Sequence, residues 1–243
     1  MTDAVTTRAL TRSFEEHIAV SGLDLSVRAG EIFGLVGPDG AGKTTTIRLL
    51  VGVLDATFGD ATILGVPLSK LDSIRPKIGY MSQRFGLYED LTVAENLLFF
   101  ARLQGVTGKK YEDRSRALLD FSGLSSFTER LAGQLSGGMK QKLGLSCALV
   151  HNPEILFLDE PTAGVDPVSR REFWRLLYGL LRDNVTIFVA TSYMDEAERC
   201  SRLAFLHDGR LVSLDTPERI RSEAGNVSLE EAFLRKVGDT DAG

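Results

Sequence analysis

Three short runs of nearly continuous apolar residues predict buried strands. They are EIFGLV at residues 31–36, EILFLD at 154–159 and VTIFVA at 185–190. Strands covered on both faces lose the apolar–polar alternation of half-exposed strands, and they are typical of parallel sheets. A further segment, RLAFLHDGRLV at 202–212, predicts a hairpin that turns at Asp208 and Gly209, because Asp-Gly pairs favour two-residue loops. The pattern therefore favours an α/β core.

Apolar residues at helical spacing predict helices around these strands. Residues 43–54 follow the first strand after a glycine-rich loop, and residues 168–182 lie between the second strand and the third. The latter segment carries an apolar stripe made of Phe173, Leu176, Leu177, Leu180 and Leu181. Such a stripe indicates packing against a core and not a binding site.

The middle of the chain has a different, purely helical pattern. Three successive helices are predicted at residues 91–103, 111–124 and 137–150. We expect a helical subdomain at about 84–151, inserted into a core formed by about 1–83 and 152–215. A last helix is expected at about 228–237, followed by a flexible tail at 238–243, because polar chain ends fray.

Composition narrows the class of protein. The 243 residues are 43% hydrophobic and 25% charged, with a net charge of −5, which is ordinary for a soluble globular protein and argues against a nucleic-acid partner. No apolar run approaches the roughly 20 residues that span a bilayer, and the first residues lack a signal-peptide core. Cys147 and Cys200 have no C-x-x-C spacing, so we expect buried thiols in the cytoplasm.

A glycine-rich loop follows the first predicted strand. GPDGAGKT, residues 37–44, fits the pattern G-x-x-x-x-G-K-[ST]. Glycines let the backbone amides point at phosphate oxygens, and the next helix presents its N-terminus to the same anion. Lys43 is expected to meet the β- and γ-phosphates, Thr44 to ligate Mg²⁺ and Thr45 to contact the α-phosphate. The predicted nucleotide-binding residues are Gly37, Pro38, Asp39, Gly40, Ala41, Gly42, Lys43, Thr44 and Thr45.

An acidic pair ends the second predicted strand. Asp159 is placed to hold Mg²⁺, directly or through water. Glu160 is placed to act as a general base on the attacking water. The alternative is an acidic pair that only caps the strand.

A second anion site is predicted at LSGGMKQK, residues 135–142. Ser136, Gly137 and Gly138 open a helix there, and helix N-termini attract phosphate groups. One nucleotide needs only one such site in a chain. The second therefore indicates a nucleotide held by another chain, unless Ser136 is a plain helix cap.

Together these motifs resemble the nucleotide-binding subunit of an ATP-binding cassette (ABC) transporter. GPDGAGKT, Gln83, LSGGMKQK, ILFLDE and Asp166 occur in the order that this family uses. The resemblance covers nearly the whole chain and implies one cassette at residues 1–237. It also implies a P-loop NTPase core, with a mostly parallel sheet, an antiparallel β subdomain and an inserted α-helical subdomain. ATP and Mg²⁺ are the implied cofactors.

The resemblance assigns roles to three more residues. Gln83 matches the loop glutamine that senses Mg²⁺ and the γ-phosphate. Asp166 matches the aspartate of a loop that crosses the interface between two cassettes. Phe14 stands where the family places an aromatic ring that stacks on adenine, although a lone phenylalanine is more often part of a core.

Longer segments are similar to ABC-2-type exporters. These segments are residues 84–97, 130–145 and 159–174. The similarity implies a separate membrane-spanning permease subunit and a place on the cytoplasmic face of the cell membrane. An apolar group after Gln83, made of Phe85, Leu87, Tyr88 and Leu91, is expected to help bind a cytoplasmic helix of the permease, or else to belong to the subdomain core.

A histidine of the family is replaced in this chain. The family carries a histidine at the position of Ser192, where it contacts the γ-phosphate and holds the attacking water. Serine is shorter and carries no positive charge, and the three histidines of the chain lie at positions without the right spacing. Either the site hydrolyses ATP slowly and pairs with a second, different cassette, or Ser192 and a water suffice in an ordinary homodimer.

Two other functions stay open from the sequence. One is an ABC ATPase without a transport role, which the acidic charge and the lack of a long coiled-coil insert argue against. The other is an assembly switch that binds ATP without hydrolysing it, which Ser192 makes possible.

Overall fold

The computed structural model describes residues 3–83 and 86–241 of the chain. The fold divides into two compact units. The first unit comprises Met1–Ile74 and Thr186–Gly243, and the second comprises Arg75–Val185. The second unit is wider than the predicted helical insert, because two strands and a long helix of the α/β core cluster with the inserted helices.

The first unit begins with an antiparallel sheet, as expected for the β subdomain. Its strand order is β2-β1-β5-β6, and β3 also pairs with β1. The strands are β1 (Asp3–Phe14), β2 (His17–Leu23), β3 (Ser26–Arg28), β5 (Phe58–Ile63) and β6 (Val66–Pro67).

Four further strands of the first unit pair with one another, three of them in parallel. They are, in sheet order, β11 (Arg210–Asp215), β10 (Arg202–His207), β4 (Ile32–Val36) and β9 (Thr186–Thr191). The pairs β10–β4 and β4–β9 are parallel, whereas β10 and β11 form the predicted antiparallel hairpin. Its turn has φ 45° at Asp208 and φ 74° at Gly209, the two positive values that favour Asp-Gly.

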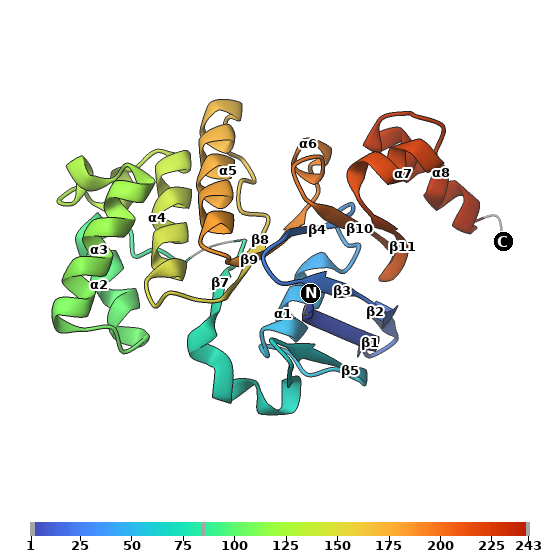
Figure 1. The fold of residues 1–243 in the computed structure, drawn as a ribbon, viewed down its shortest axis with the longest axis horizontal. Coiled ribbons are helices and arrows are strands. Elements are labelled where there is room, and N and C mark those ends of the chain that lie inside the picture. Colours follow the sequence, from blue (N-terminus) through green and yellow to red (C-terminus); the bar gives the residue numbers. More distant parts are fainter. Residues whose placement is uncertain (1–2, 84–85, 242–243) are drawn as a thin grey trace. The chain divides into compact units, whose positions relative to one another are not determined.

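The helices of the first unit are α1 (Lys43–Leu50), α6 (Met194–Ala197), α7 (Pro217–Glu223) and α8 (Leu229–Asp241). Helix α1 ends four residues before the predicted boundary at 54, and α8 continues four residues beyond 237. Figure 1 shows α7 and α8 side by side near β11, in agreement with their contacts. Phe205 of β10 packs against Phe233 of α8, with ring centroids 5.1 Å apart.

The second unit contains two parallel strands, β7 (Ile78–Met81) and β8 (Ile155–Asp159). Its helices are α2 (Val93–Leu103), α3 (Gly108–Ser122), α4 (Gly137–Leu149) and α5 (Pro167–Arg182). Helix α4 contacts α2, α3 and α5, and these helices stand next to one another in Figure 1. Short 3₁₀ segments lie at Leu68–Lys77, Ser125–Phe127 and Ala132–Gln134.

Burial agrees with the predicted patterns in most places. Phe173, Leu177 and Leu180 of the α5 stripe are buried, and so is Trp174.

Both cysteines are buried free thiols, and burial raises the pKa of each. Among the residues that the structure describes, no helix combines the length and the apolar character that crossing a bilayer requires.

A buried asparagine fixes the loop that precedes α2. Asn96 is fully buried, and its amide nitrogen donates to the carbonyl oxygens of Tyr88, Leu91 and Thr92 at 2.9, 3.1 and 3.0 Å. Its amide oxygen accepts from the backbone nitrogen of Tyr88 at 2.9 Å. One side chain therefore holds both ends of the segment 88–92.

Asn96→Leu keeps a similar side-chain volume but leaves the polar backbone groups around it without their partner. We expect the free energy of unfolding to fall by about 1–3 kcal/mol, the cost of leaving buried polar groups unsatisfied. Chemical denaturation measures it. Gln104→Leu, at an exposed position just after the same helix, is the control, and equal midpoints for both variants would contradict this role for Asn96.

Candidate functional site

The predicted phosphate loop connects β4 to α1 within the first unit. Residue Gly37 follows the last residue of β4, and its backbone nitrogen donates to the carbonyl oxygen of Thr191 at 3.3 Å. The backbone nitrogen of Ala41 donates to the carbonyl oxygen of Pro38 at 3.2 Å. The loop is therefore tied at its start to the end of β9 and is closed on itself.

Two glycines of this loop leave no room for a side chain. A Cβ atom on Gly37 would lie 2.2 Å from the carbonyl oxygen of Leu206. A Cβ atom on Gly42 would lie 2.3 Å from the carbonyl oxygen of Ala19, and Gly42 also has φ 101°. Glycine is required at both positions, because the obstructing atoms belong to backbone that cannot move independently.

The start of α1 and the Lys43 side chain form a positive site. Gly42 is the N-cap of α1, no side chain caps the helix and its first turn holds no acidic residue. Lys43 is 5% exposed, and its ammonium donates to the carbonyl oxygens of Gly37 and Pro38 at 2.8 and 2.9 Å. A helix N-terminus with no capping side chain, next to a buried ammonium, fits a phosphate group. The residues present therefore suit a nucleotide.

Phe14 lies at the end of β1 and is 41% exposed. The guanidinium carbon of Arg12 lies 4.5 Å from the centroid of its ring. A cation thus covers part of the ring, and a purine could stack on the ring or take the place of the arginine.

Ser192 follows β9 and is half-buried, and α6 begins two residues later. The residue before it, Thr191, supplies the carbonyl that accepts from Gly37. Within this unit the fold therefore brings residues 191–193, here called the Ser192 turn, next to the start of the phosphate loop.

The second unit brings together two predicted catalytic residues. Glu160 is 9% exposed and follows β8 with φ 47°, a left-handed conformation that is strained for a residue with a side chain. The amide nitrogen of Gln83 donates to a carboxylate oxygen of Glu160 at 3.0 Å. Asp159, the last residue of β8, is 1% exposed. Strain at Glu160 with a side-chain partner in place is typical of functional positions.

The predicted second anion site begins α4 in the same unit. The hydroxyl of Ser136 accepts from the backbone nitrogen of Met139 at 3.3 Å, so Ser136 is the N-cap. Space around Gly137 is open, whereas a Cβ atom on Gly138 would lie 2.5 Å from both Cβ and Oγ of Ser169. Gly138 thus permits close packing between α4 and α5.

Asp166 caps α5. Its carboxylate accepts from the backbone nitrogens of Val168 and Ser169, both at 3.0 Å. Hydrogen bonds from the Ser169 amide and then from the Ser169 hydroxyl lower the pKa of Asp166, which keeps the group ionised. Ser169 therefore contacts two predicted residues, Asp166 and Gly138.

The apolar group after Gln83 is partly accessible. Leu87 and Leu91 are half-buried, and Tyr88 is 48% exposed, with its ring centroid 4.6 Å from that of Phe99. Phe85, the remaining member, lies outside the described residues. The three described members of the group are therefore neither all buried in the core nor all exposed on the surface.

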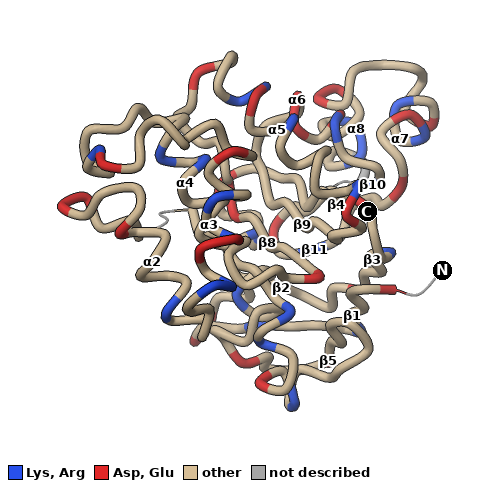
Figure 2. The backbone as a smooth tube through the Cα atoms, turned by 60° about the vertical axis from the view of Figure 1, so that its left-hand side comes forward, with Lys and Arg blue, Asp and Glu red and all other residues tan. Residues whose placement is uncertain are grey.

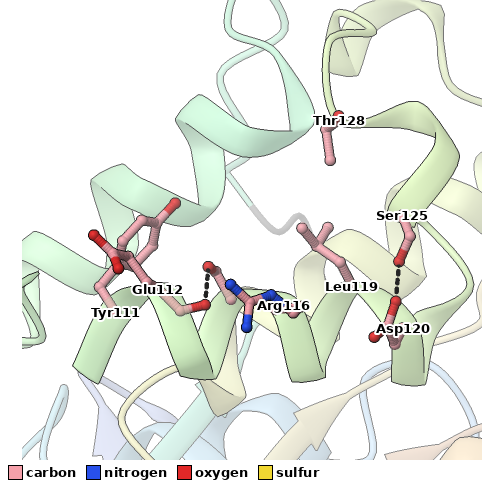
Figure 3. Close-up of a pocket in the computed structure, with 8 residues that line it drawn as sticks. Tyr111, Glu112, Arg116, Leu119, Asp120, Ser125 and Thr128 are labelled. Carbon is pink, nitrogen blue, oxygen red and sulfur yellow. Dashed lines mark hydrogen bonds between the residues drawn. The ribbon is translucent and has the colours of Figure 1, made fainter. Parts of the chain in front are cut away.

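A pocket of about 360 Å³ lies on α3 and the segment that follows it (Figure 3). It is lined by Tyr111, Glu112, Ser115, Arg116, Leu119, Asp120, Ser125 and Thr128. The hydroxyl of Ser125 donates to Asp120. Acidic and basic residues are mixed along α3 (Figure 2), and none of the predicted site residues belongs to the pocket lining.

Residues 20–163 match the family described as ABC transporter, which covers more than half of the chain. The chain belongs to this family. The cassette is 48% identical over 224 residues to the probable multidrug ABC transporter ATP-binding protein YbhF of Escherichia coli, a match that covers 90% of this chain and 39% of the relative. The cassette thus spans about two fifths of the length of that curated relative.

Two further similarities concern a shorter relative and a solved structure. The Nod factor export ATP-binding protein I of Burkholderia lata is 40% identical over 226 residues, which cover 92% of the cassette and 74% of the relative. A dimeric structure of the ATP-binding cassette MJ0796, in a post-hydrolysis state bound to ADP and Pi, matches with a TM-score of 0.78 and 28% identity. That match covers 87% of the cassette and 98% of the other chain. The predicted P-loop NTPase fold is confirmed.

Two residues whose side chains make contacts at or beside the predicted site were not predicted from the sequence. Ser169 lies within an ordinary helical pattern and becomes visible only through its contact with Gly138. Glu196, a buried carboxylate that accepts a hydrogen bond from Thr191, lies in an acidic segment of the sequence. A serine or glutamate on a helix carries no sequence signal of such a contact.

Gly138→Ala tests the close packing of α4 on α5. The added methyl group would collide with Ser169, so we expect the free energy of unfolding to fall by about 1–3 kcal/mol, as for other overpacked sites. Gly137→Ala is the matched control, because the space around Gly137 is open. Thermal melting compares the two variants, and equal stability would show that Ser169 does not restrict position 138.

Proposed function

We propose that the cassette is the ATP-binding subunit of an ABC-2-type exporter and hydrolyses Mg-ATP to drive a separate permease. The observation that carries this proposal is the phosphate loop, with its two obligatory glycines, the buried ammonium of Lys43 and the start of α1 free of a capping side chain. The multidrug and Nod factor export functions in the names of the two relatives support export as the direction.

In this proposal the phosphate loop binds the triphosphate of ATP. Lys43 leaves the carbonyl oxygens of Gly37 and Pro38 and pairs with the β- and γ-phosphates. Backbone amides within residues 39–45 donate to the phosphate oxygens, with Thr45 near the α-phosphate, and Phe14 stacks on adenine. Thr44, Asp159 and Gln83 supply the hydroxyl, carboxylate and amide oxygens that suit Mg²⁺, which would neutralise phosphate charge.

Glu160 is the proposed general base. Its carboxylate accepts a proton from the attacking water as the γ-phosphate is transferred to that water. Gln83 now donates to this carboxylate through its amide nitrogen, so the pair is aligned before any nucleotide arrives. Turning the amide oxygen of Gln83 toward the metal would release Glu160 for the water.

Two cassettes are proposed to meet head to tail, with each ATP between the phosphate loop of one chain and the α4 N-terminus of the other. Ser136, Gly137 and Gly138 then donate to the γ-phosphate of the partner chain, and Asp166 lies at the interface. The dimeric state of the MJ0796 structure, bound to ADP and Pi, supports this arrangement. Loss of the γ-phosphate removes the acceptor to which both chains donate, and the dimer opens.

Ser192 makes hydrolysis in this chain's own site slow in the proposal. A serine hydroxyl is half-buried at the position where an imidazole would reach the γ-phosphate, and it reaches less far. A second cassette with the histidine would then hydrolyse most of the ATP. We therefore propose an asymmetric heterodimer in preference to a homodimer. The same serine favours the second candidate function, an ATP-dependent assembly switch that does not hydrolyse ATP.

The permease is proposed to bind the exposed part of the segment 87–91, where Tyr88 is accessible and Asn96 holds the backbone. This contact would place the cassette on the cytoplasmic face of the membrane. The net charge of −5 disfavours the alternative of an ABC ATPase that acts on nucleic acid.

Ser192→His should raise the steady-state Mg-ATPase rate of the purified cassette. We expect a gain of roughly tenfold or more, because one additional donor to developing charge is worth that much or more in other enzymes. Lys43→Ala sets the background rate, and Glu160→Gln should fall to it. Phosphate release measures all four proteins.

Ser126→His, which adds a histidine at an exposed position of the second unit, is the control for non-specific effects. If the wild-type cassette turns over well and Ser192→His adds nothing, Glu160 with serine or water is a working site and the asymmetric reading is wrong.

ATP should join two cassettes when hydrolysis is blocked. For Glu160→Gln we expect a dimer in Mg-ATP and a monomer in ADP, measured by light scattering after size exclusion. Lys43→Ala should stay monomeric in both nucleotides. A wild-type protein that dimerises with ATP yet releases no phosphate would favour the assembly switch. A monomer under every condition would contradict head-to-tail pairing of two copies of this chain and leave only a different cassette as the partner.

A further inference from the structure

A buried carboxylate lies directly beside the Ser192 turn. Glu196 of α6 is 0% exposed, although acidic side chains are rarely buried without a partner. The hydroxyl of Thr191, also 0% exposed, donates to a carboxylate oxygen of Glu196 at 2.6 Å. The proposed roles of the motif residues do not use this carboxylate.

The Thr191 hydroxyl connects the carboxylate to the backbone of the turn. Its oxygen accepts from the backbone nitrogen of Tyr193 at 3.1 Å, while its hydrogen is directed to Glu196. Ser192 lies between the two residues joined in this way. The orientation of the hydroxyl thus limits the conformations open to the Ser192 backbone.

The same threonine contacts the phosphate loop through its backbone. The carbonyl oxygen of Thr191 accepts from the backbone nitrogen of Gly37 at 3.3 Å, and Val36 pairs with Thr191 across β4 and β9. Gly37 has no freedom to adjust, because the carbonyl oxygen of Leu206 fills the space where a Cβ would stand. If Thr191 moves, Gly37, the first residue of the phosphate loop, must therefore move with it.

We propose that Glu196 is a positioning residue which, through Thr191, holds the Ser192 turn in place against the start of the phosphate loop. This inference rests on the proposed ATP hydrolysis for its catalytic consequence. The structural part of the inference does not rest on ATP hydrolysis, because the contacts of Thr191 with Glu196 and Gly37 join protein atoms within one unit.

Paired variants separate the effect of losing the hydrogen bond between Thr191 and Glu196 from the effect of changing side-chain volume. Glu196→Leu and Thr191→Val remove the acceptor and the donor, whereas Glu196→Gln and Thr191→Ser keep them. Glu198→Gln is the matched control, because Glu198 is exposed and lies two residues further along the same segment. If Glu196→Leu does not fold, Thr191→Val removes the same bond with a nearly unchanged shape.

Hydrogen–deuterium exchange of the nucleotide-free protein is the first measurement. We expect exchange to be roughly tenfold faster at residues 37–42 and 191–195 in Glu196→Leu and Thr191→Val, because local opening becomes easier. Residues 58–63 of β5 serve as the internal reference and should not change. The conservative variants and Glu198→Gln should match the wild type.

Kinetics are the second measurement. For the two disruptive variants we expect kcat to fall about tenfold while KM changes less than about threefold, because a misplaced turn harms the transition state more than binding. Glu196→Gln should recover most of kcat, a rescue that distinguishes positioning from a requirement for charge.

Two results would overturn the inference. Unchanged exchange at 37–42 and 191–195 in folded Thr191→Val would show that the contact does not hold the turn. Equal acceleration at 58–63 would make Glu196 a general stabiliser without a positioning role. If exchange changes as expected but wild type hydrolyses no ATP, the positioning link stands and the proposed function fails.

Discussion

The close approach of two backbone carbonyls to the phosphate loop is the constraint on which the site depends. The carbonyl oxygens of Leu206 and Ala19 occupy the space that a Cβ would need at Gly37 and Gly42. The loop is therefore shaped before a ligand arrives, because neither strand end can withdraw without breaking its sheet. A preformed loop places the start of α1 without an ordering cost at the moment of binding.

Several predicted residues are held by contacts within their own unit. In the first unit, Thr191 joins the Ser192 turn to Gly37. In the second, Gln83 meets Glu160, and Ser169 contacts both Asp166 and Gly138. Residues that are far apart in the motif pattern are thus connected by single residues. Such connections let a change at one motif move another, since packed contacts transmit displacement.

The motifs and the buried strands were predictable because their physical requirements leave clear patterns in sequence. Glycines with a following lysine, acidic residues after an apolar strand and the Asp208-Gly209 turn are of this kind. The strands of the antiparallel sheet were not assigned one by one, since their apolar alternation is weak. The contacts of Glu196, Ser169 and Asn96 depend on tertiary packing, which no local pattern records.

Binding of ATP by the phosphate loop is the central claim, and calorimetric titration of the purified cassette with Mg-ATP tests it most directly. Lys43→Ala removes the buried ammonium, and Lys109→Ala removes an exposed lysine of α3 as the control. The account predicts one ATP per chain for wild type and Lys109→Ala, with affinity at least about tenfold weaker for Lys43→Ala, as expected for a lost charged contact. Equal binding by all three proteins, or binding by none, would contradict it.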